Sequence, residues 1–306
     1  MVETIGIDVG GTKTGAVRLA ADGRVLARAR RLTPYDSPES LVAMLADLVE
    51  ELRTGAVAGV GIGLPGLVES ATGTLAFAPR PLLRDLPLRD LLQEAVGLAV
   101  AVENDADVAA WAERALGAAR GHDDILLVAP GTGLGCGVIS RGRSFGGAHG
   151  FAVEAWHLLV EPGNPTCFGD LASGTAISAL GREAAAAHPR SILRGLAGGD
   201  PAHVTGELVT QAARQGDEAA IVVLRRAGQV LGMGIATLVT LFDPTIVVVG
   251  GGPSAAGELL LGPAREAYRE ALPVGPDRGA LQIVLAQLGN QAAAIGAALL
   301  AGEISP

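Results

Sequence analysis

The sequence predicts an α/β protein of two domains, and three observations support this. The chain has 306 residues, which is enough for two domains of ordinary size. Hydrophobic residues make up 49% of it and charged residues only 18%, so a large core is available. One strand–turn–strand pattern occurs once in each half, as "TIGIDVGGTKTGAVRLA" and as "DILLVAPGTGLGCGVIS".

Composition and charge exclude several classes of function. The formal charge of -9 provides no basic surface for nucleic acid and no polybasic cluster for a membrane. The run "AGQVLGMGIATLVTLF" is too short and too rich in glycine for a membrane span, so we expect a buried helix. No signal-peptide pattern opens the sequence, and Cys136 and Cys167 form no disulfide framework. We expect a cytoplasmic protein without nucleic-acid or membrane partners.

The two repeated turns align, because Gly11-Thr12 falls on Gly131-Thr132. Glycine lets backbone N–H groups approach an anion closely, and the threonines add hydroxyl donors. The spacing of a Walker A loop is absent. Each turn alone is more typical of an ordinary hairpin. Two in register, with Asp8 and Lys13 beside the first, favour two phosphate-binding turns.

Two further features fit a nucleotide site. Asp8 ends the first strand, where the second copy has Val128, and a carboxylate beside a phosphate suits Mg²⁺, directly or through water. In "PTIVVVGGGPSAAGELL", a buried strand leads through Gly250–Gly252 into a helix. No acidic residue follows at the dinucleotide-binding position, so this turn is equally suited to the nucleoside end of ATP.

A candidate base lies in "LAVAVENDADVAAWAERALGAA". This stretch predicts a strand to about Val102 and then a helix, with Asn104 or Asp105 as the cap. The positive end of the helix favours an ionised Asp105, as a base that accepts a hydroxyl proton requires. The alternative is that both residues only cap the helix.

Together, "IGIDVGGTKT", "GVGIGLPGLVE", "AVENDADVAAWAE", "GTGLGCGVI", "VVVGGGPSAAGELLL" and "AQLGNQAAAIGAALLA" resemble the ROK family of sugar kinases and repressors, in particular bacterial ROK glucokinases. The resemblance runs from residue 4 to about residue 301. It implies an actin/hexokinase-like α/β fold of two domains with a duplicated RNase H-like core and a cleft between them. It also implies that the last helix returns to the N-terminal domain. We therefore expect a smaller domain of 1–112 with 290–306, and a larger one of 113–289.

The resemblance also implies roles for individual residues. Asp105 would be the catalytic base, and ATP with Mg²⁺ the cofactors, with Asp8 binding Mg²⁺ indirectly. The other donor-site residues would be Gly10, Gly11, Thr12, Lys13, Thr132, Gly133, Gly250, Gly251 and Gly252. Sugar-binding residues would be Asn104, Asp105, Gly66, Glu154, His157 and, at the position of a family asparagine, Arg80. A homodimer is expected on the same ground.

The acceptor side departs from the family pattern in three places. "GNPTCFGDLASG" replaces a zinc-binding loop and keeps only Cys167, so we expect no structural zinc; its sugar-binding glutamate is lost or replaced by Asp170. Trp156 stands where the family has glycine, so His157 either binds sugar or packs in the core. Arg80 either faces the pocket, where it suits anionic or acceptor-rich groups, or turns to solvent.

Intact phosphate motifs beside an altered acceptor side predict an ATP-dependent kinase for the primary, 6-type hydroxyl of a hexose or hexose-like ring. The altered residues favour a modified sugar, such as the aminohexose kanosamine or a C7 cyclitol. Two alternatives stay open. One is an ordinary glucokinase with a rebuilt, zinc-less loop, and the other is a non-catalytic sugar-binding sensor.

Overall fold

The computed structural model describes residues 2–78, 83–160, 163, 165–272 and 281–304. The chain divides into two compact units, which are treated separately below. The first unit comprises residues 1–123, 137–153 and 287–306, and the second comprises residues 124–136 and 154–286. The domain limits expected from the sequence, at 112/113 and 289/290, stay a prediction.

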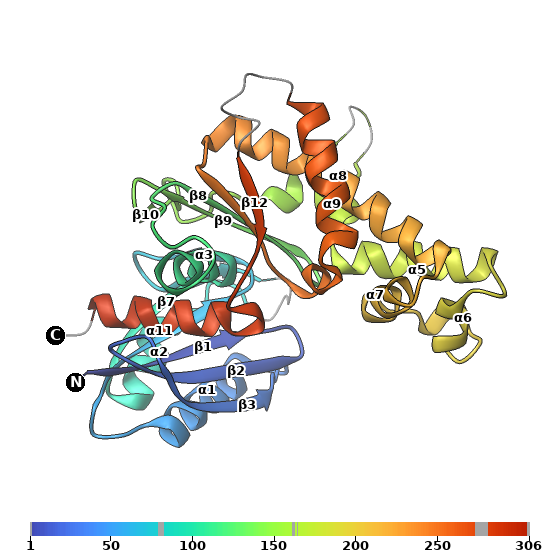
Figure 1. The fold of residues 1–306 in the computed structure, drawn as a ribbon. Coiled ribbons are helices and arrows are strands. Elements are labelled where there is room, and N and C mark those ends of the chain that lie inside the picture. Colours follow the sequence, from blue (N-terminus) through green and yellow to red (C-terminus); the bar gives the residue numbers. More distant parts are fainter. Residues whose placement is uncertain (1, 79–82, 161–162, 164, 273–280, 305–306) are drawn as a thin grey trace. The chain divides into compact units, whose positions relative to one another are not determined.

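The first unit is built on a five-stranded sheet with the order β3-β2-β1-β4-β7 (Figure 1). β1, β2 and β3 are antiparallel neighbours, whereas β4 and β7 continue from β1 in parallel. The strands are β1 Glu3–Val9, β2 Lys13–Ala20, β3 Val25–Leu32, β4 Val57–Leu64, β7 Ala99–Asn104 and the small hairpin β5 Leu67–Glu69 and β6 Thr74–Phe77. The helices are α1 Pro38–Leu52, α2 Leu88–Val96, α3 Asp105–Leu116, the 3₁₀ turn η4 Gly289–Gln291 and α11 Ala292–Ile304.

Alternation along β4 gives this sheet two different faces. Apolar side chains such as Val60 and Ile62 are fully buried on one face, in the core that α1 and α2 also line. Gly61 points to the other face, where a Cβ would lie 1.8 Å from the carbonyl oxygen of Ala297 in α11. The missing side chains allow α11 to lie directly on the strand backbones, beside α3 (Figure 1). The predicted return of the last helix to the N-terminal part of the chain is confirmed.

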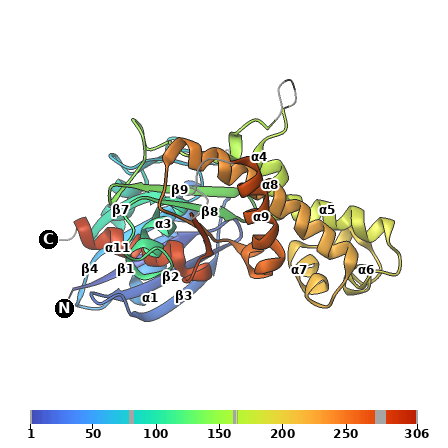
Figure 2. The same ribbon diagram turned by 45° about the horizontal axis from the view of Figure 1, so that its top comes forward.

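The second unit contains β8, β11 and β12, which are parallel neighbours in a sheet with the order β10-β9-β8-β11-β12. α8 and α9 lie side by side, as both ribbon views show (Figures 1 and 2). The strands of the second unit are β8 Ile125–Pro130, β11 Ile246–Val249 and β12 Gln282–Leu285. β9 Leu134–Ser140 begins in this unit, and β10 Arg143–Ser144 belongs to residues 137–153 of the first unit. The helices and 3₁₀ turns are η1 Ala155–His157, α4 Phe168–Ala172, α5 Gly174–Ala187, α6 Ile192–Leu196, η2 Pro201–His203, α7 Gly206–Arg214, α8 Glu218–Phe242, η3 Gly252–Ala256 and α9 Glu258–Ala271.

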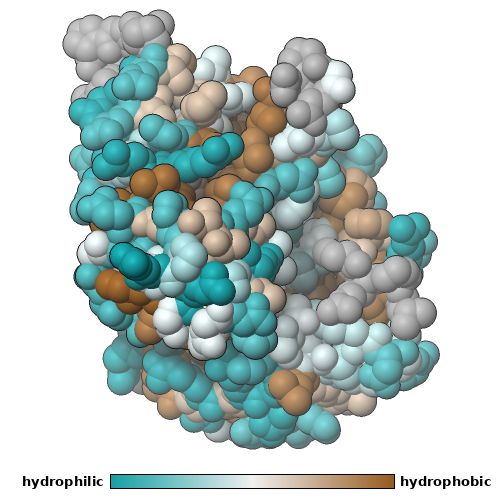
Figure 3. All heavy atoms as spheres, turned by 90° about the vertical axis from the view of Figure 1, so that its right-hand side faces the viewer, coloured by the Kyte–Doolittle hydropathy of each residue, from teal (hydrophilic) through white to brown (hydrophobic). Residues whose placement is uncertain are grey.

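The predicted repeat is present, because β1 and β2, like β8 and β9, are neighbouring strands joined by a Gly-Thr turn. α8 is the only helix in the described part of the chain that has the length and hydropathy of a membrane span. However, 56% of its apolar window is buried inside the structure, as in the core helix expected from the sequence. The face shown in Figure 3 carries hydrophobic residues in small groups among hydrophilic ones.

Candidate active site

The first Gly-rich turn, in the first unit, is held by hydroxyl groups that follow β3. The carbonyl oxygen of Gly10 accepts hydrogen bonds from the hydroxyls of Thr33, at 2.8 Å, and Tyr35, at 2.9 Å. The amide of Thr33 in turn donates to the carbonyl of Thr12 at 3.0 Å. Gly11 is exposed, and no atom lies within 4 Å of the point where its Cβ would be. The turn is therefore braced on one side and open to an anion at Gly11.

Two carboxylates of the first unit interact beside this turn. Burial and, to a smaller extent, the charge of Asp105 together raise the pKa of Asp8 to about 7. Burial also raises the pKa of Asp105, against the lowering effect of backbone hydrogen bonds at Ala106 and Asp105 itself. Burial of Asp105 thus opposes the effect of the helix end, which was expected from the sequence to favour the ionised form. A raised pKa nevertheless suits a general base near neutral pH.

The same carboxylate pair tests the fit of Mg²⁺. Mg²⁺ is usually held by one or two carboxylates together with substrate phosphates and water. Two partly buried carboxylates that repel one another, next to a phosphate-type turn, have this donor chemistry. Among the described residues, no group of three or more His, Cys, Asp or Glu side chains is placed to hold a metal. Asp8 is thus suited to a cation shared with a phosphate.

Asn104 is the N-cap of α3, and its side chain is fixed at both ends. Its Oδ1 accepts from the backbone amides of Ala106, at 2.8 Å, and Asp107, at 3.3 Å. Its Nδ2 donates to the carbonyl of Gly66 at 3.0 Å. Gly66 has a φ of +118°, and a Cβ there would lie 2.2 Å from the carbonyl oxygen of Phe77, so only glycine fits. The structure thus brings Gly66, Asn104 and the adjoining Asp105 together.

Sequence reasoning missed Glu103, which precedes this group. Its Oε1 accepts from the Asn104 amide at 2.9 Å. Burial raises the pKa of Glu103, while hydrogen bonds from Asn104 and the Ser70 side chain lower it. Glu103 therefore supports the backbone that carries the cap and the candidate base. The only signal in the sequence is its position beside Asn104.

The second Gly-rich turn, in the second unit, is joined to the start of α5. The amide of Gly174 donates to the carbonyl of Gly131 at 2.7 Å, and the hydroxyl of Thr175 donates to the carbonyl of Thr132 at 2.7 Å. The third turn packs on β8, where Gly251 has a φ of +71° and its Cβ would lie 1.9 Å from the Pro130 carbonyl oxygen. Gly251 therefore does not tolerate a side chain without a backbone shift.

A pocket of about 860 Å³ opens between these two turns and the helices α5 and α7 of the second unit. It is large enough for a nucleotide, and the N-terminal ends of α5 and α7 contribute to its wall. Thr132 and Gly252 had been predicted from the sequence. Residues that had not been predicted are Thr175, Ser178, Thr205, Glu207, Thr210, Gln211 and Arg214. These polar residues lie in α5, in α7 and at the residue before α7, and they match no motif, so no sequence signal marked them.

The other residues expected to bind the sugar lie in the second unit or outside the described residues. Glu154 precedes η1 in the second unit, and His157 is the last residue of η1 and is exposed. The alternative that His157 packs in the core is therefore wrong. Asp170 accepts a hydrogen bond from the Cys167 amide at 2.9 Å, at the start of α4. Arg80 lies outside the described residues. The expectation of no structural zinc stays a prediction.

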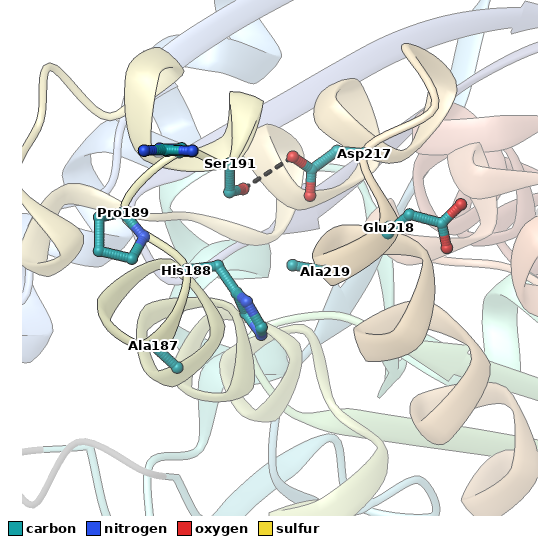
Figure 4. Close-up of a pocket in the computed structure, with 8 residues that line it drawn as sticks. Ala187, His188, Pro189, Ser191, Asp217, Glu218 and Ala219 are labelled. Atoms are coloured by element: carbon teal, nitrogen blue, oxygen red, sulfur yellow. Dashed lines mark hydrogen bonds between the residues drawn. The ribbon is translucent and has the colours of Figure 1, made fainter.

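A second hollow, of about 460 Å³, contains none of the predicted site residues (Figure 4). It lies between the end of α5 and the start of α8, and Ser191 and Asp217 line it. The Ser191 hydroxyl donates to Asp217 at 2.7 Å. Burial would raise the pKa of Asp217, but hydrogen bonds from Ala220, Ser191 and Ile192 lower it overall. Asp217 also caps α8, so this carboxylate has a structural role.

Comparison with known proteins identifies the family. Residues 4–304 match the sequence pattern of the ROK family. The chain belongs to the ROK family. It is 38% identical to a glucokinase of Streptomyces coelicolor over 313 aligned positions, which cover 99% of this chain and 98% of the relative. The family predicted from the sequence is confirmed.

Solved structures confirm the predicted fold class. A ROK family glucokinase from Streptomyces griseus, in complex with glucose and AMPPNP, superimposes with a TM-score of 0.90. It is 39% identical, and the match covers 98% of this chain and 99% of that one. A ROK hexokinase from Thermus thermophilus has a TM-score of 0.78 at 33% identity, with 99% and 98% covered. The chain therefore has the two-domain actin/hexokinase-like fold of ROK kinases.

Proposed function

We propose that the protein is a glucokinase that transfers the terminal phosphoryl group of ATP to the 6-hydroxyl of glucose. The observation that carries this proposal is the full-length similarity to the Streptomyces griseus enzyme, whose structure holds glucose and an ATP analogue. Whole-chain similarity to glucokinases and a hexokinase makes the chain an ATP-dependent sugar kinase. The finer choice of glucose rests on the relatives named glucokinase.

This proposal replaces the modified sugar expected from the sequence. The comparisons favour the alternative of an ordinary glucokinase with a rebuilt loop. Asp170 and Trp156 are two of the departures from the family pattern that suggested a modified sugar, and both make contacts within the second unit. Asp170 is bonded to the Cys167 amide, and the ring of Trp156 packs against two glycines. Neither contact argues for a modified sugar.

The proposed mechanism assigns each residue a task that its surroundings favour. Asp105 accepts the proton of the sugar 6-hydroxyl, for which its raised pKa is suited. Asn104 orients the acceptor, since its Oδ1 is fixed by the helix end and its Nδ2 by Gly66. Glu154 and His157 contact further sugar hydroxyls. When bound with ATP, Mg²⁺ would be held through Asp8 and would offset charge on the phosphates.

The donor would be held by backbone amides rather than by an array of cations. Gly10 to Lys13 and Thr132 with Gly133 would contact the phosphates. The pocket between Thr132, Gly252 and α7 would hold the nucleoside. Arg214 is the only cationic side chain among the pocket residues, and its guanidinium already donates to the Ala255 carbonyl. A nucleotide therefore fits this pocket better than a polyphosphate chain, which would need several cations.

Asp105→Asn tests the mechanism. We expect kcat with glucose and ATP to fall by about 10²- to 10⁴-fold, because the proton acceptor is lost. Glucose binding by calorimetry should change little. Asp90→Asn is the matched control, since Asp90 is also in the first turn of a helix, α2, but is exposed. Near-normal turnover in Asp105→Asn would refute the assignment.

A substrate panel tests the choice of sugar. Glucose, mannose, N-acetylmannosamine, an aminohexose and a cyclitol are compared by kcat/KM, with ATP and then polyphosphate as donor. We expect the highest value with glucose and ATP. A higher value with the aminohexose or the cyclitol would restore the modified-sugar hypothesis. Binding of sugar without turnover of any would favour the sensor.

We also propose a cytoplasmic homodimer, on the family resemblance. Light scattering should give twice the chain mass of 30.7 kDa. A mass of 30.7 kDa would contradict the dimer. Cell fractionation with recovery in the soluble fraction would support the location.

A further inference from the structure

Trp156 lies between the two acceptor-side residues Glu154 and His157, in the 3₁₀ turn η1. Its indole ring rests on two glycines of the second unit. A Cβ at Gly169 in α4 would lie 2.2 Å from Cδ2 of the ring, and a Cβ at Gly133 would lie 3.3 Å from Cε3 and Cζ3. The ring therefore contacts both α4 and the second Gly-rich turn. Contact with Gly169 is so close that a side chain there would displace the ring.

α4, on which the ring rests, is itself anchored in the core of the second unit. Phe168 is 1% exposed, and its ring occupies the space left by Gly234 in α8, where a Cβ would lie 2.1 Å from Cζ. The Phe168 amide donates to the carbonyl of Leu158 at 2.8 Å, which ties α4 back to the residue after η1. Trp156 is thus seated on a fixed support and cannot shift freely.

We propose that Trp156 is a positioning residue that sets the acceptor-side residues Glu154 and His157 relative to the phosphate-binding turn at Thr132 and Gly133. This inference rests on the proposed function, which assigns sugar hydroxyls to the first pair and phosphate to the turn. An indole has only two side-chain torsions and a large rigid face. Its contacts therefore fix the position of the backbone at η1 relative to the turn at Gly133. Both segments that the ring contacts have a glycine at the contact point, Gly133 and Gly169, and this leaves room for the ring.

Trp156 would thereby link the position of the residues proposed to bind the sugar to that of the turn proposed to bind the phosphates. Phosphoryl transfer depends on the alignment of acceptor and donor, and a displacement of about 1 Å can cost on the order of 10²-fold in rate. Removing the ring leaves Glu154 and His157 chemically intact but no longer braced against Gly133. The loss should therefore appear mainly in kcat, because each substrate keeps its own contacts.

Steady-state kinetics of Trp156→Gly, Trp156→Leu and Trp156→Phe test this. We expect kcat to fall by about 10- to 100-fold in Trp156→Gly and to a smaller extent in Trp156→Leu. Trp156→Phe should recover to within about threefold of the parent, since a second aromatic ring can span the same gap. KM values for glucose and ATP should change less than kcat. Trp111→Phe is the matched control, because Trp111 is the other tryptophan and is also half-buried, but lies in α3.

Fluorescence gives a readout that does not depend on turnover. Trp111→Phe leaves Trp156 as the only tryptophan of the chain. We expect its emission to change on addition of AMPPNP alone, because the ring contacts Gly133. Glucose alone should also change it, through the flanking Glu154 and His157. An unchanged emission at AMPPNP concentrations that calorimetry shows to be saturating would overturn the proposal.

The remaining outcomes separate this proposal from the proposed function. If Trp156→Gly lowers the urea midpoint but leaves kcat per folded molecule unchanged, the ring is only structural and the proposal is wrong. If Trp156→Gly does not fold, Trp156→Leu and Trp156→Phe decide by the same comparison of kcat. If the parent phosphorylates no glucose but AMPPNP still changes Trp156 emission, the glucokinase assignment fails while the contact with the turn stands.

Discussion

Removal of the buried Glu113 in α3 should destabilise the first unit. Its side chain is fully buried and accepts three backbone hydrogen bonds. Oε2 accepts from the amides of Ala118, at 2.7 Å, and Gln287, at 3.1 Å, and Oε1 accepts from Leu288 at 2.8 Å. Glu113 therefore fastens the segment that leads into α11 to the end of α3. The two segments are more than 170 residues apart in the sequence.

The cost of Glu113→Ala follows from these bonds. Each backbone donor left facing the emptied site loses a net contribution of at least about 1 kcal/mol. Three donors together give a loss of roughly 3 kcal/mol or more in the free energy of unfolding of the first unit. Glu113→Gln keeps one oxygen for Ala118 and Gln287 but turns an amide NH₂ toward the Leu288 donor. That variant should lose about 1–3 kcal/mol, less than alanine.

Urea unfolding followed by circular dichroism measures both losses, with Glu94→Ala as the control on an exposed position of α2. Hydrogen exchange should show faster exchange of the amides of Gln287 and Leu288 in Glu113→Ala. A loss under about 1 kcal/mol in that variant, or equal losses in both variants, would refute this reasoning.

Three further predictions concern other parts of the chain. Asp217→Ala should lower the free energy of unfolding by about 0.5–2 kcal/mol, through loss of the α8 cap. Because the folded pKa of Asp217 lies below the ordinary value, this stabilisation is present at neutral pH; in urea titrations at pH 7 and pH 3 the difference should shrink at the lower pH. Gly61→Ala should lower the melting temperature, because its Cβ would lie 1.8 Å from the Ala297 carbonyl oxygen; an unchanged melting temperature would contradict the close packing of α11. Metal analysis of the purified chain should find well under one zinc per chain, and a stoichiometric zinc would overturn the expectation drawn from the lone Cys167.

Local patterns in the sequence were enough to predict much of the fold. The Gly-Thr turns between strands, the Asn104 cap and the buried helix before Phe242 all depend on neighbouring residues, and the structure contains all three. The family resemblance added the packing of α11. Glu113 could not have been predicted, because a single glutamate in an Ala-rich helix is typical of a solvated face. Its partners at 287 and 288 come close only in the folded chain.

At the candidate site, too, features set by neighbouring residues could be predicted from the sequence, and features set by long-range packing could not. The positions of Asp8 and Asp105 followed from strand and helix ends, but the upward shifts of their pKa values did not. A helix N-terminus alone favours an ionised carboxylate. In the structure, burial raises the pKa of both residues, and the charge of Asp105 adds to the shift at Asp8. Desolvation is a property of the packed unit and leaves no mark in the local sequence.

A changed residue in a ligand motif need not mean a changed ligand. Trp156 stands where the family pattern has glycine, and Asp170 takes the place of its sugar-binding glutamate. These changes first suggested a different sugar. In the structure, Asp170 is bonded to the Cys167 amide, and Trp156 packs on Gly133 and Gly169. Both substitutions therefore act on how the acceptor segment is held. A segment without the usual cysteines still has to be held, and an aromatic ring on two glycines is a change of support. Under the proposed function, the choice of hydroxyls stays with Glu154, His157 and Asn104.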